Sequence, residues 1–224
     1  MKAVRIKEHG GSEVMSYEDV EQPQAGATEV LIKVEAAGIN YIDTYQRSGL
    51  YQIPLPATLG LEASGTVAQI GSDLSRFQVG DRVAYTNVLG AYADYAAVDQ
   101  DKVVSIPDAV SFDEGAAAML QGCTAHYLSQ STYPIKSGDS CLIHAAAGGV
   151  GLILIQMAKN AGAYVIGTVS TEEKAELARA AGADEVILYT QTDFETEVKR
   201  ITDGEGVNVV YDSVGKTTFE KSID

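Results

Sequence analysis

The fold of this chain is decided by one stretch, Cys141-Leu-Ile-His-Ala-Ala-Ala-Gly-Gly-Val-Gly-Leu-Ile-Leu-Ile155. The apolar run over residues 140–145 predicts a buried strand, and the glycines directly after it predict a tight turn. Apolar residues from about 150 to 160 then predict a helix, which Ala161-Gly162 ends. A strand, a glycine turn and a helix in this order open a dinucleotide-binding βαβ unit.

The spacing of the turn, Ala146-x-Gly148-x-x-Gly151, places alanine at the first of the three glycine positions of that motif. Gly148 lets the backbone approach a pyrophosphate, and Gly151 lets the helix pack closely on the strand. The helix N-terminus supplies unpaired N–H groups and partial positive charge for phosphates. A tight turn in any α/β protein is the alternative, but a second strand at 164–168 favours cofactor binding. The predicted cofactor-turn residues are Ala146, Gly148, Gly149, Val150 and Gly151.

Composition sets the class of protein before any motif does. The chain has 224 residues with 46% hydrophobic content, enough for a real core, and it shows neither a bilayer-spanning run nor a signal-peptide profile. With 16 basic and 31 acidic residues the net charge is −15, which opposes binding to nucleic acid or to an anionic membrane. The cysteines, Cys123 and Cys141, lie in apolar contexts, so we expect a cytoplasmic protein without disulfides or a cysteine-rich metal site.

The first half of the chain is rich in short strands with turns between them, a pattern typical of a compact barrel-like or sandwich domain. The predicted strands are 3–7, 30–36, 65–70, 81–85, 91–98 and 102–105. Within 30–36, the side chains of Val30, Ile32 and Val34 share one face. A capping box at Ser111 then predicts a helix through Met119, interrupted at Gly122 and continued from 123 to 129.

From residue 140 onward, strands and helices alternate, which predicts a doubly wound parallel sheet. The predicted strands are 140–145, 164–168, 185–188 and 207–211, and the helices are about 150–160, 171–181 and 194–202. A dinucleotide fold of this type usually has about six strands. The sheet is therefore expected to be incomplete, either because the chain is a fragment or because its sequence was cut short.

The chain resembles the quinone oxidoreductase (zeta-crystallin) family of the medium-chain dehydrogenase/reductase superfamily. The glycine-turn signature is carried by Gly138-Asp-x-x-Leu142, Ala146-Ala-Gly-Gly149, Gly151, Gln156 and Lys159. Further family motifs follow in family order: Gly38-Ile-Asn-Tyr-Ile-Asp-Thr-Tyr45, Arg47-Ser-Gly-Leu-Tyr51, Gly60-Leu-Glu62 and Val79-Gly-Asp-Arg-Val83. The resemblance implies an α/β architecture with a GroES-like catalytic domain at 1–122, a Rossmann NADP-binding domain at 123–224, and an active site in the cleft between them. It also implies that the family's C-terminal segment, which completes the Rossmann sheet and returns to the catalytic domain, is missing.

Other members of this superfamily bind zinc. The presence or absence of zinc ligands therefore indicates which branch of the superfamily this chain resembles. The alcohol dehydrogenase branch has a cysteine in the stretch where this chain has Asn40, and a histidine where it has Leu61. Neither residue is a plausible zinc ligand. The four-cysteine structural lobe is also missing, because the chain passes directly from Tyr85 to Ala91. We therefore expect no metal.

Without a metal, hydrogen bonds must orient the acceptor. In the resembling family, the residues that match Asn40, Tyr45 and Tyr51 line the substrate cleft, and Asp43 lies in the same motif. The alternative is that the two tyrosines are loop aromatics at the domain edge and that Asn40 completes a turn. Thr124 matches a position near the nicotinamide, or is a hydroxyl at a helix start.

Cofactor choice follows from charge. NAD enzymes place an acidic residue about 20 residues after the glycines to bind the ribose hydroxyls. This chain has Thr168-Val-Ser170 there, without an acid. Ser170, Lys174 and Tyr189 match the family site for the 2′-phosphate of NADPH, and hydroxyls with a cation suit a phosphate dianion. The alternatives are that Ser170 is a helix N-cap and that Lys174 is a solvated lysine.

Another loop, Asp212-Ser-Val-Gly215, follows the last strand at the carboxyl edge, where cofactors lie, so Ser213, Val214 and Gly215 are predicted to contact the nicotinamide side. His144 is expected to be a buried, hydrogen-bonded histidine, and Glu62 to be structural.

The predicted function is a zinc-independent NADPH:quinone reductase. One alternative is an NADPH-dependent reductase of enones or other α,β-unsaturated carbonyls. Another, from a different class, is a truncated chain that binds nucleotide without turnover. The resemblance further implies a homodimer.

Overall fold

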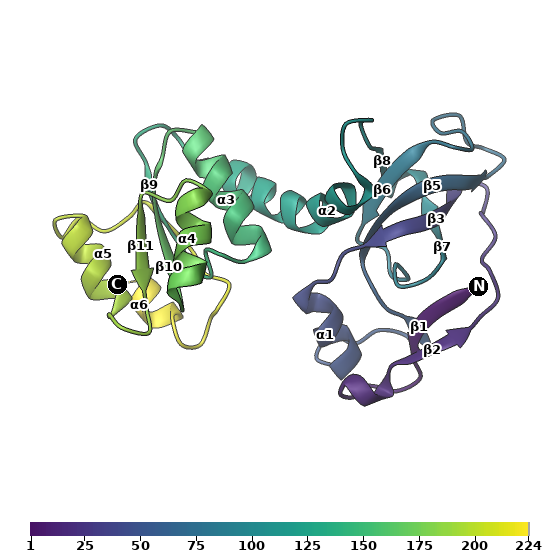
Figure 1. Ribbon diagram of the computed structural model, residues 1–224, viewed down its shortest axis with the longest axis horizontal. Helices are drawn as coiled ribbons and strands as arrows, with labels where there is room; N and C mark the ends of the chain where they lie inside the picture. The colour runs from purple at the N-terminus through teal and green to yellow at the C-terminus, as the bar shows by residue number, and fades with distance from the viewer. Residues whose placement is uncertain (224) are drawn as a thin grey trace. The chain divides into compact units, whose positions relative to one another are not determined.

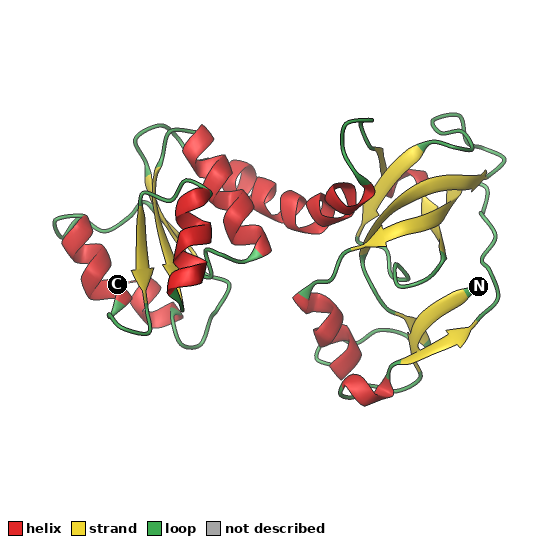
Figure 2. Cartoon of the chain, viewed as in Figure 1, coloured by secondary structure: helices red, strands yellow, loops and turns green. Residues whose placement is uncertain are grey.

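The computed structural model describes residues 1–223 of the chain. The chain divides into two compact units, residues 1–120 and residues 121–224. Figure 1 labels the elements of both units, and Figure 2 shows that strands dominate the first unit whereas helices flank the strands of the second. In the described part of the chain, no helix combines the length and the apolar character needed to cross a membrane.

The main sheet of the first unit is antiparallel and has five strands. In spatial order these are β7 (Tyr95–Asp99), β3 (Glu29–Ala37), β5 (Glu62–Ile70), β6 (Arg82–Thr86) and β8 (Val103–Ser105). Val30 and Ile32 are fully buried and Val34 packs against the same cluster, which confirms the predicted face of β3. The prediction of a continuous strand was wrong over 91–94, where the chain has only an isolated antiparallel bridge between Ala93 and Ala3 ahead of β7.

A smaller antiparallel sheet in this unit joins three segments that are far apart in sequence: β2 (Ser16–Asp19), β1 (Lys2–Ile6) and β4 (Ala57–Thr58). It encloses a small core of Ile6, Ala57 and Leu59. The sequence predicted β1 only. Its partners carry little local signal, because β2 has only partly buried or exposed side chains and β4 is two residues long.

One helix of the first unit, α1 (Tyr41–Ser48), was not predicted. Asn40 is its N-cap, and Asp43 at the third helical position completes a capping box. Gly49 ends the helix in the left-handed conformation, with a φ of 82°. Short 3₁₀ helices lie at Ser12–Val14 and Gln100–Lys102.

The predicted capping box at Ser111 is present: Ser111 N donates to Glu114 Oε2 over 2.8 Å and Glu114 N donates to Ser111 Oγ over 3.2 Å. It opens α2 (Phe112–Tyr127), which is continued by a π-helical turn at Leu128–Thr132. The predicted interruption at Gly122 is wrong, because α2 runs through it unbroken. One glycine in a helix interior costs only about 1 kcal/mol relative to alanine, less than a long helix can absorb.

The second unit contains a parallel sheet with the spatial order β11 (Glu185–Leu188), β10 (Tyr164–Val169), β9 (Ser140–Ile143) and β12 (Val209–Tyr211). Counted along this unit, the order is 3-2-1-4, which is how the Rossmann order 3-2-1-4-5-6 begins. The predicted parallel sheet is therefore confirmed, and all four predicted strands are present.

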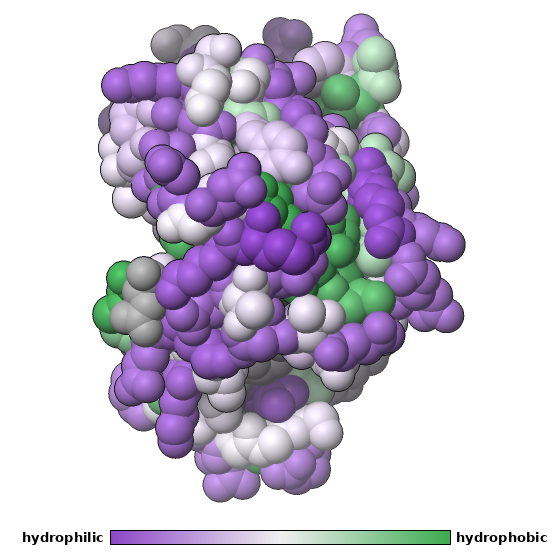
Figure 3. Space-filling view, turned by 90° about the vertical axis from the view of Figure 1, so that its left-hand side faces the viewer, coloured by the Kyte–Doolittle hydropathy of each residue, from purple (hydrophilic) through white to green (hydrophobic). Residues whose placement is uncertain are grey.

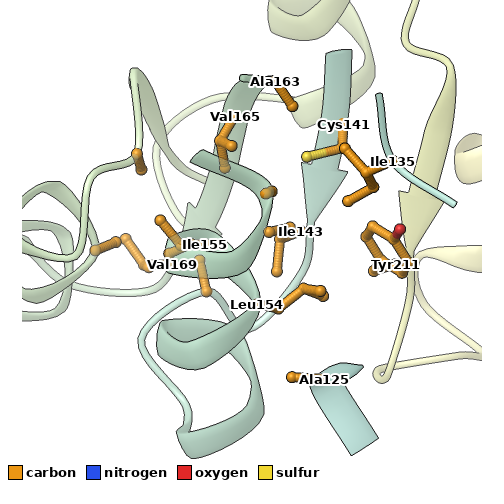
Figure 4. Close-up of a cluster of buried hydrophobic side chains, with 14 of the residues drawn as sticks. Ala125, Ile135, Cys141, Ile143, Leu154, Ile155, Ala163, Val165, Val169 and Tyr211 are labelled. Atoms are coloured by element: carbon orange, nitrogen blue, oxygen red, sulfur yellow. The ribbon is translucent and has the colours of Figure 1, made fainter. Parts of the chain in front are cut away.

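Helices cover both faces of this sheet. They are α3 (Gly149–Asn160), α4 (Glu172–Ala180), α5 (Phe194–Ile201) and the short α6 (Phe219–Ile223). Alternation along β9 shows the two layers: Cys141 and Ile143 pack with α3 and α4, whereas Leu142 packs with Phe194 of α5. Figure 4 shows the first of these layers, with Leu154 and Ile155 of α3 against β9 and β10. This two-sided core fixes the end of β9 against the start of α3.

Candidate active site and cofactor site

The turn between β9 and α3 has the geometry of a phosphate site. Gly148 N donates to Ala145 O over 2.8 Å, and Gly148 is the N-cap of α3. The first amide that bonds back into the helix is that of Leu152, to Gly148 O at 2.9 Å. The amides of residues 149–151 therefore have no intrahelical acceptor, and they carry the partial positive charge of the helix N-terminus.

The glycines of the turn have different roles. A Cβ on Gly151 would lie 2.6 Å from the carbonyl oxygens of both Ala145 and Ala146, so Gly151 allows the helix to pack on the end of the strand. A Cβ on Gly149 would overlap the carboxamide of Gln121. Among the described residues, a Cβ on Gly148 would meet only Ala145 O within 4 Å, at 3.1 Å. The open space at Gly148, beside unpaired amides, fits a pyrophosphate.

The three residues predicted for a 2′-phosphate lie together at the carboxyl edge of the sheet. Ser170 follows β10 and Tyr189 follows β11, and these parallel strands are paired up to Val169 and Leu188. Lys174 Nζ donates to Ser170 Oγ over 3.2 Å. The alternative that Ser170 caps α4 is wrong, because the N-cap is Thr171, whose side chain accepts from Lys174 N. The Ser170 hydroxyl is therefore not occupied as a helix cap.

Two further contacts around Ser170 were not anticipated from the sequence. Thr190 Oγ1 donates to Ser170 O over 3.0 Å, which ties the loop after β11 to the loop after β10. Glu172, in the first turn of α4, accepts from Arg179 Nη1 over 2.5 Å. This ion pair offsets the charge of one of the two carboxylates in the first turn of α4.

The loop after β12 is organised by Asp212. Its Oδ1 accepts from Val214 N and Gly215 N at 2.8 and 2.9 Å, and its Oδ2 accepts from Thr218 Oγ1 at 2.7 Å and Ser222 Oγ at 3.1 Å. Burial alone would raise the pKa of Asp212, but these hydrogen bonds outweigh it and lower the pKa. The carboxylate thus fixes the predicted nicotinamide-side residues Ser213, Val214 and Gly215 at the carboxyl edge of the sheet.

His144 is buried and hydrogen-bonded, as predicted. Its Nδ1 lies 2.8 Å from Thr168 Oγ1, and its Nε2 lies 3.2 Å from Ser222 Oγ. Burial lowers its pKa, so the ring is neutral at pH 7. Thr124 lies in the interior of α2, so the alternative that it starts a helix is wrong.

In the first unit, Asn40 and Asp43 belong to one buried network. Asn40 N donates to Asp43 Oδ2 over 2.8 Å, and Tyr92 Oη donates to the same oxygen over 2.6 Å. Asn40 Nδ2 donates to Glu62 Oε1 over 2.7 Å, and Leu120 N donates to Glu62 Oε2 over 2.6 Å. Sequence reasoning missed Tyr92, which no motif marks, and it assigned Glu62 a structural role without a partner.

Burial governs the titration of this network. Glu62 is fully buried, and its desolvation raises its pKa, although the hydrogen bonds from Asn40 and Leu120 oppose the shift. Desolvation, with the bond to Asp43, also raises the pKa of Tyr92. Tyr92 therefore remains a donor to Asp43 at every physiological pH.

Tyr45 and Tyr51 form a separate pair. Their rings meet edge to face with centroids 5.5 Å apart, and Tyr51 N donates to Tyr45 O over 3.1 Å. Their exposed fractions are 37% and 53%. Ile39, Tyr41 and Leu50, also exposed, belong to the same segment. This segment therefore exposes several large hydrophobic and aromatic side chains to solvent. Figure 3 shows one face of the molecule, much of which is hydrophilic.

The two positions that correspond to zinc ligands in the alcohol dehydrogenase branch hold residues with structural roles. Asn40 is the cap of α1, and Leu61 is buried. Among residues 1–223 there is no group of three or more His, Cys, Asp or Glu side chains arranged to hold a metal.

Two family descriptions match the chain. Residues 26–108 match the alcohol dehydrogenase GroES-like domain, and residues 149–224 match the zinc-binding dehydrogenase family. Together with the 3-2-1-4 sheet and its glycine turn, these matches define a medium-chain dehydrogenase/reductase.

Comparison with individual relatives identifies the family within this superfamily. A quinone oxidoreductase of Pseudomonas aeruginosa is 48% identical over 225 residues, covering 100% of this chain and 69% of the relative. A 2-haloacrylate reductase of a Burkholderia species is 42% identical, covering 99% of this chain and 69% of the relative. The crystal structure of Escherichia coli quinone oxidoreductase complexed with NADPH superposes with a TM-score of 0.97 at 45% identity, covering 100% of this chain and 69% of that one. The chain belongs to the quinone oxidoreductase family.

Proposed function

We propose that the protein is an NADPH-dependent oxidoreductase that reduces a quinone without zinc. The observation that carries the cofactor assignment is the contact of Lys174 with Ser170 beside Tyr189, at a strand end without a carboxylate. The NADPH bound to the Escherichia coli relative supports the same choice. When bound, NADPH supplies the reducing equivalents, and the protein supplies position and polarity.

Different residues of the second unit are assigned to different parts of the cofactor. Amides of the turn (Gly149, Val150 and Gly151) hold the pyrophosphate, with Gly148 leaving room for it. Ala146 belongs to the same turn and occupies its first motif position. Ser170, Lys174 and Tyr189 hold the 2′-phosphate, since a lysine with two hydroxyls complements a phosphate dianion. The nicotinamide side is assigned to Thr124, Ser213, Val214 and Gly215. Each of the two anionic groups, the pyrophosphate and the 2′-phosphate, is thus assigned to a cluster of hydrogen-bond donors.

The acceptor is assigned to the first unit. Asn40 donates an amide N–H to a carbonyl oxygen of the acceptor, and the exposed hydroxyls of Tyr45 and Tyr51 supply further donors. Asp43 acts through Asn40: its buried carboxylate holds the backbone of Asn40 and the start of α1. Aromatic faces at Tyr45 and Tyr51 suit a flat quinone ring.

Zinc independence is supported by donor chemistry. Although residues 149–224 match a family described as zinc-binding dehydrogenase, the amide of Asn40 and the alkyl side chain of Leu61 are not zinc ligands. Glu62, the nearest carboxylate in sequence, already accepts from Asn40 and Leu120. Hydrogen-bond donors therefore replace the Lewis acid of the alcohol dehydrogenase branch.

The test is NADPH oxidation by the purified chain with a panel of small quinones, enones and 2-haloacrylates, together with zinc analysis of the same sample. Quinone turnover that survives a chelator, with far less than one zinc per chain, is the expected result. Turnover of enones alone would favour the second candidate, an enone reductase, which the 42% identity to a 2-haloacrylate reductase supports. NADPH binding without turnover would favour a chain that binds nucleotide only. The predicted homodimer and cytoplasmic location stay predictions, and light scattering tests the first.

A further inference from the structure

We propose that Glu62 is a positioning residue for this reduction, because its carboxylate fixes which end of the Asn40 amide is presented to the acceptor. The inference rests on the proposed function, since it takes Asn40 as the donor to the acceptor oxygen.

The geometry gives each oxygen of Glu62 one donor. Oε1 accepts from Asn40 Nδ2 at 2.7 Å, and Oε2 accepts from Leu120 N at 2.6 Å. The side chain is fully buried, so water does not compete for these oxygens. A carboxylate in this position holds three segments: β5, the start of α1, and α2.

The Glu62 carboxylate also packs closely against the backbone of Gly38. Gly38 N donates to Glu62 O over 3.1 Å, and a Cβ on Gly38 would overlap Oε1 and Cδ of Glu62. Glu62 therefore has no space to withdraw toward Gly38, and its carboxylate stays directed at Asn40. In the described part of the chain no cation pairs with Glu62, although burying an unpaired carboxylate is unfavourable.

The chemistry of the pair is selective. The oxygen and nitrogen ends of an asparagine amide have almost the same shape, so only hydrogen-bond partners decide which end points where. A carboxylate accepts and cannot donate, so Glu62 selects Nδ2 and excludes Oδ1. One N–H of Asn40 is thereby fixed on Glu62, and the direction of the other N–H follows from the planar amide.

The decisive variant is Glu62→Gln, which preserves volume. Its carboxamide has one acceptor oxygen instead of two, so Leu120 N and Asn40 Nδ2 compete for it. The Asn40 amide then loses one of the two partners that orient it, and keeps only the capping-box bond from the backbone of Asp43 to its side chain. We expect the kcat/KM for a quinone such as 1,4-benzoquinone to fall about tenfold, with the Kd for NADPH within about twofold. This loss is smaller than the roughly 10²–10³-fold cost of removing such a donor outright, because the Asn40 amide is still present in the variant. Glu62→Asp, one methylene shorter, tests the same point if Glu62→Gln does not fold.

Asn40→Ala and the double variant separate positioning from other roles. If Glu62 acts through Asn40, Glu62→Gln has no further effect on kcat/KM in the Asn40→Ala background. An equal loss in both backgrounds would overturn the inference, as would an unchanged Glu62→Gln beside an impaired Asn40→Ala. An Asn40→Ala variant with normal turnover would remove Asn40 from the proposed site and the inference with it.

An NMR experiment tests the orientation of the Asn40 amide independently of enzymatic turnover. The chain has four asparagines, so selective ¹⁵N labelling gives few side-chain amide signals, and the Asn40 pair is identified by its loss in Asn40→Ala. We expect this pair to shift in Glu62→Gln and to stay in place in Tyr92→Phe, the matched control, which removes the Tyr92 bond to Asp43. An Asn40 signal unmoved by Glu62→Gln would refute positioning. A chain that shows this shift but oxidises no NADPH would place the failure in the proposed function.

Discussion

Lys174 Nζ lies 3.2 Å from Ser170 Oγ, so the cation is held one residue beyond the end of β10 before any phosphate arrives. Preorganisation of this kind means that little side-chain entropy remains to be lost on binding. The strand end carries no carboxylate, and Glu172, the first acidic residue of α4, is paired with Arg179. In the proposed 2′-phosphate site, Lys174 is therefore the residue whose charge we expect to matter most for cofactor preference.

Replacement of Lys174 by glutamate tests this preference. A charge-assisted hydrogen bond contributes about 1.5–3 kcal/mol, so Lys174→Glu is expected to raise the Kd for NADPH at least tenfold. The Kd for NADH, which lacks the 2′-phosphate, is expected to change little. Fluorescence titration measures both. Lys136→Glu makes the same change of charge at an exposed site in the same unit and serves as the control. An NADPH affinity unchanged by Lys174→Glu would remove the 2′-phosphate assignment.

Two glycines of the second unit make a matched pair. In Gly151→Ala the new Cβ meets two backbone carbonyl oxygens at 2.6 Å, and backbone atoms yield little, so we expect a loss of about 1–3 kcal/mol in the free energy of unfolding. Gly122→Ala adds a Cβ inside α2, where no described atom lies within 4 Å, and it is expected to stabilise by up to about 1 kcal/mol. Urea unfolding measures both. Equal effects in the two variants would contradict the close packing at Gly151.

Stability should depend on pH through Asp212. Its pKa in the folded protein is below the ordinary value of 3.8, so its contribution to stability is present above that value and is lost as the pH falls through the lower, folded-state pKa. Asp212→Asn is expected to destabilise by about 1–3 kcal/mol at pH 7. One charged acceptor oxygen becomes a neutral one, and the other is replaced by an NH2 group that faces donors and cannot accept from them. The difference from the unmodified chain should shrink below about pH 4. Unfolding midpoints at several pH values measure this.

A control for that series is Asp203→Asn, at an exposed position in the left-handed conformation, which asparagine tolerates. A stability difference between Asp212→Asn and the unmodified chain that stayed constant down to pH 3 would contradict the role given to the Asp212 carboxylate.

The tyrosine hydroxyls can be removed without disturbing the rings. Tyr45→Phe and Tyr51→Phe keep the edge-to-face contact, and both side chains are partly exposed, so thermal stability should hardly change. If the hydroxyls bind the acceptor, kcat/KM for the quinone falls about tenfold in at least one variant, whereas the Kd for NADPH stays the same. Tyr17→Phe, exposed on β2, is the control. Normal kinetics in both Tyr45→Phe and Tyr51→Phe would assign these residues to packing alone.

Elements of the second unit that depend on neighbouring residues in the sequence were predicted correctly. The strand, the glycine turn and the α3 helix are adjacent in sequence. Within this stretch Gly148 is the N-cap of α3, and close packing leaves no room for a side chain at Gly151. The pairing of β2 and β4 with β1 was missed because it depends on contacts between distant segments, which leave no periodicity.

The same limit applies to the site. Ser170 and Thr171 both fit an N-cap pattern, and only the observed start of α4 at Glu172, with Lys174 N donating to the Thr171 side chain, decides that Thr171 is the cap. The contact between Asn40 and Glu62 spans 22 residues, so the motif that contains each of them does not reveal their hydrogen bond. Residue types support a prediction of the chemistry at the site, whereas the hydrogen-bond partners of each residue follow only from the three-dimensional structure.

The place of β9 between β10 and β12 has a consequence for biosynthesis. Asn208 accepts from Ser140 N over 2.8 Å, just ahead of the strand that completes the second edge of β9, 68 residues downstream. During translation, that edge stays uncovered until residues 209–211 leave the ribosome, so the nascent unit exposes a pairing-competent strand for several seconds at about 5–20 residues per second. Chaperone capture of a stalled chain should therefore fall sharply once the codons for β12 have been read and its residues have emerged.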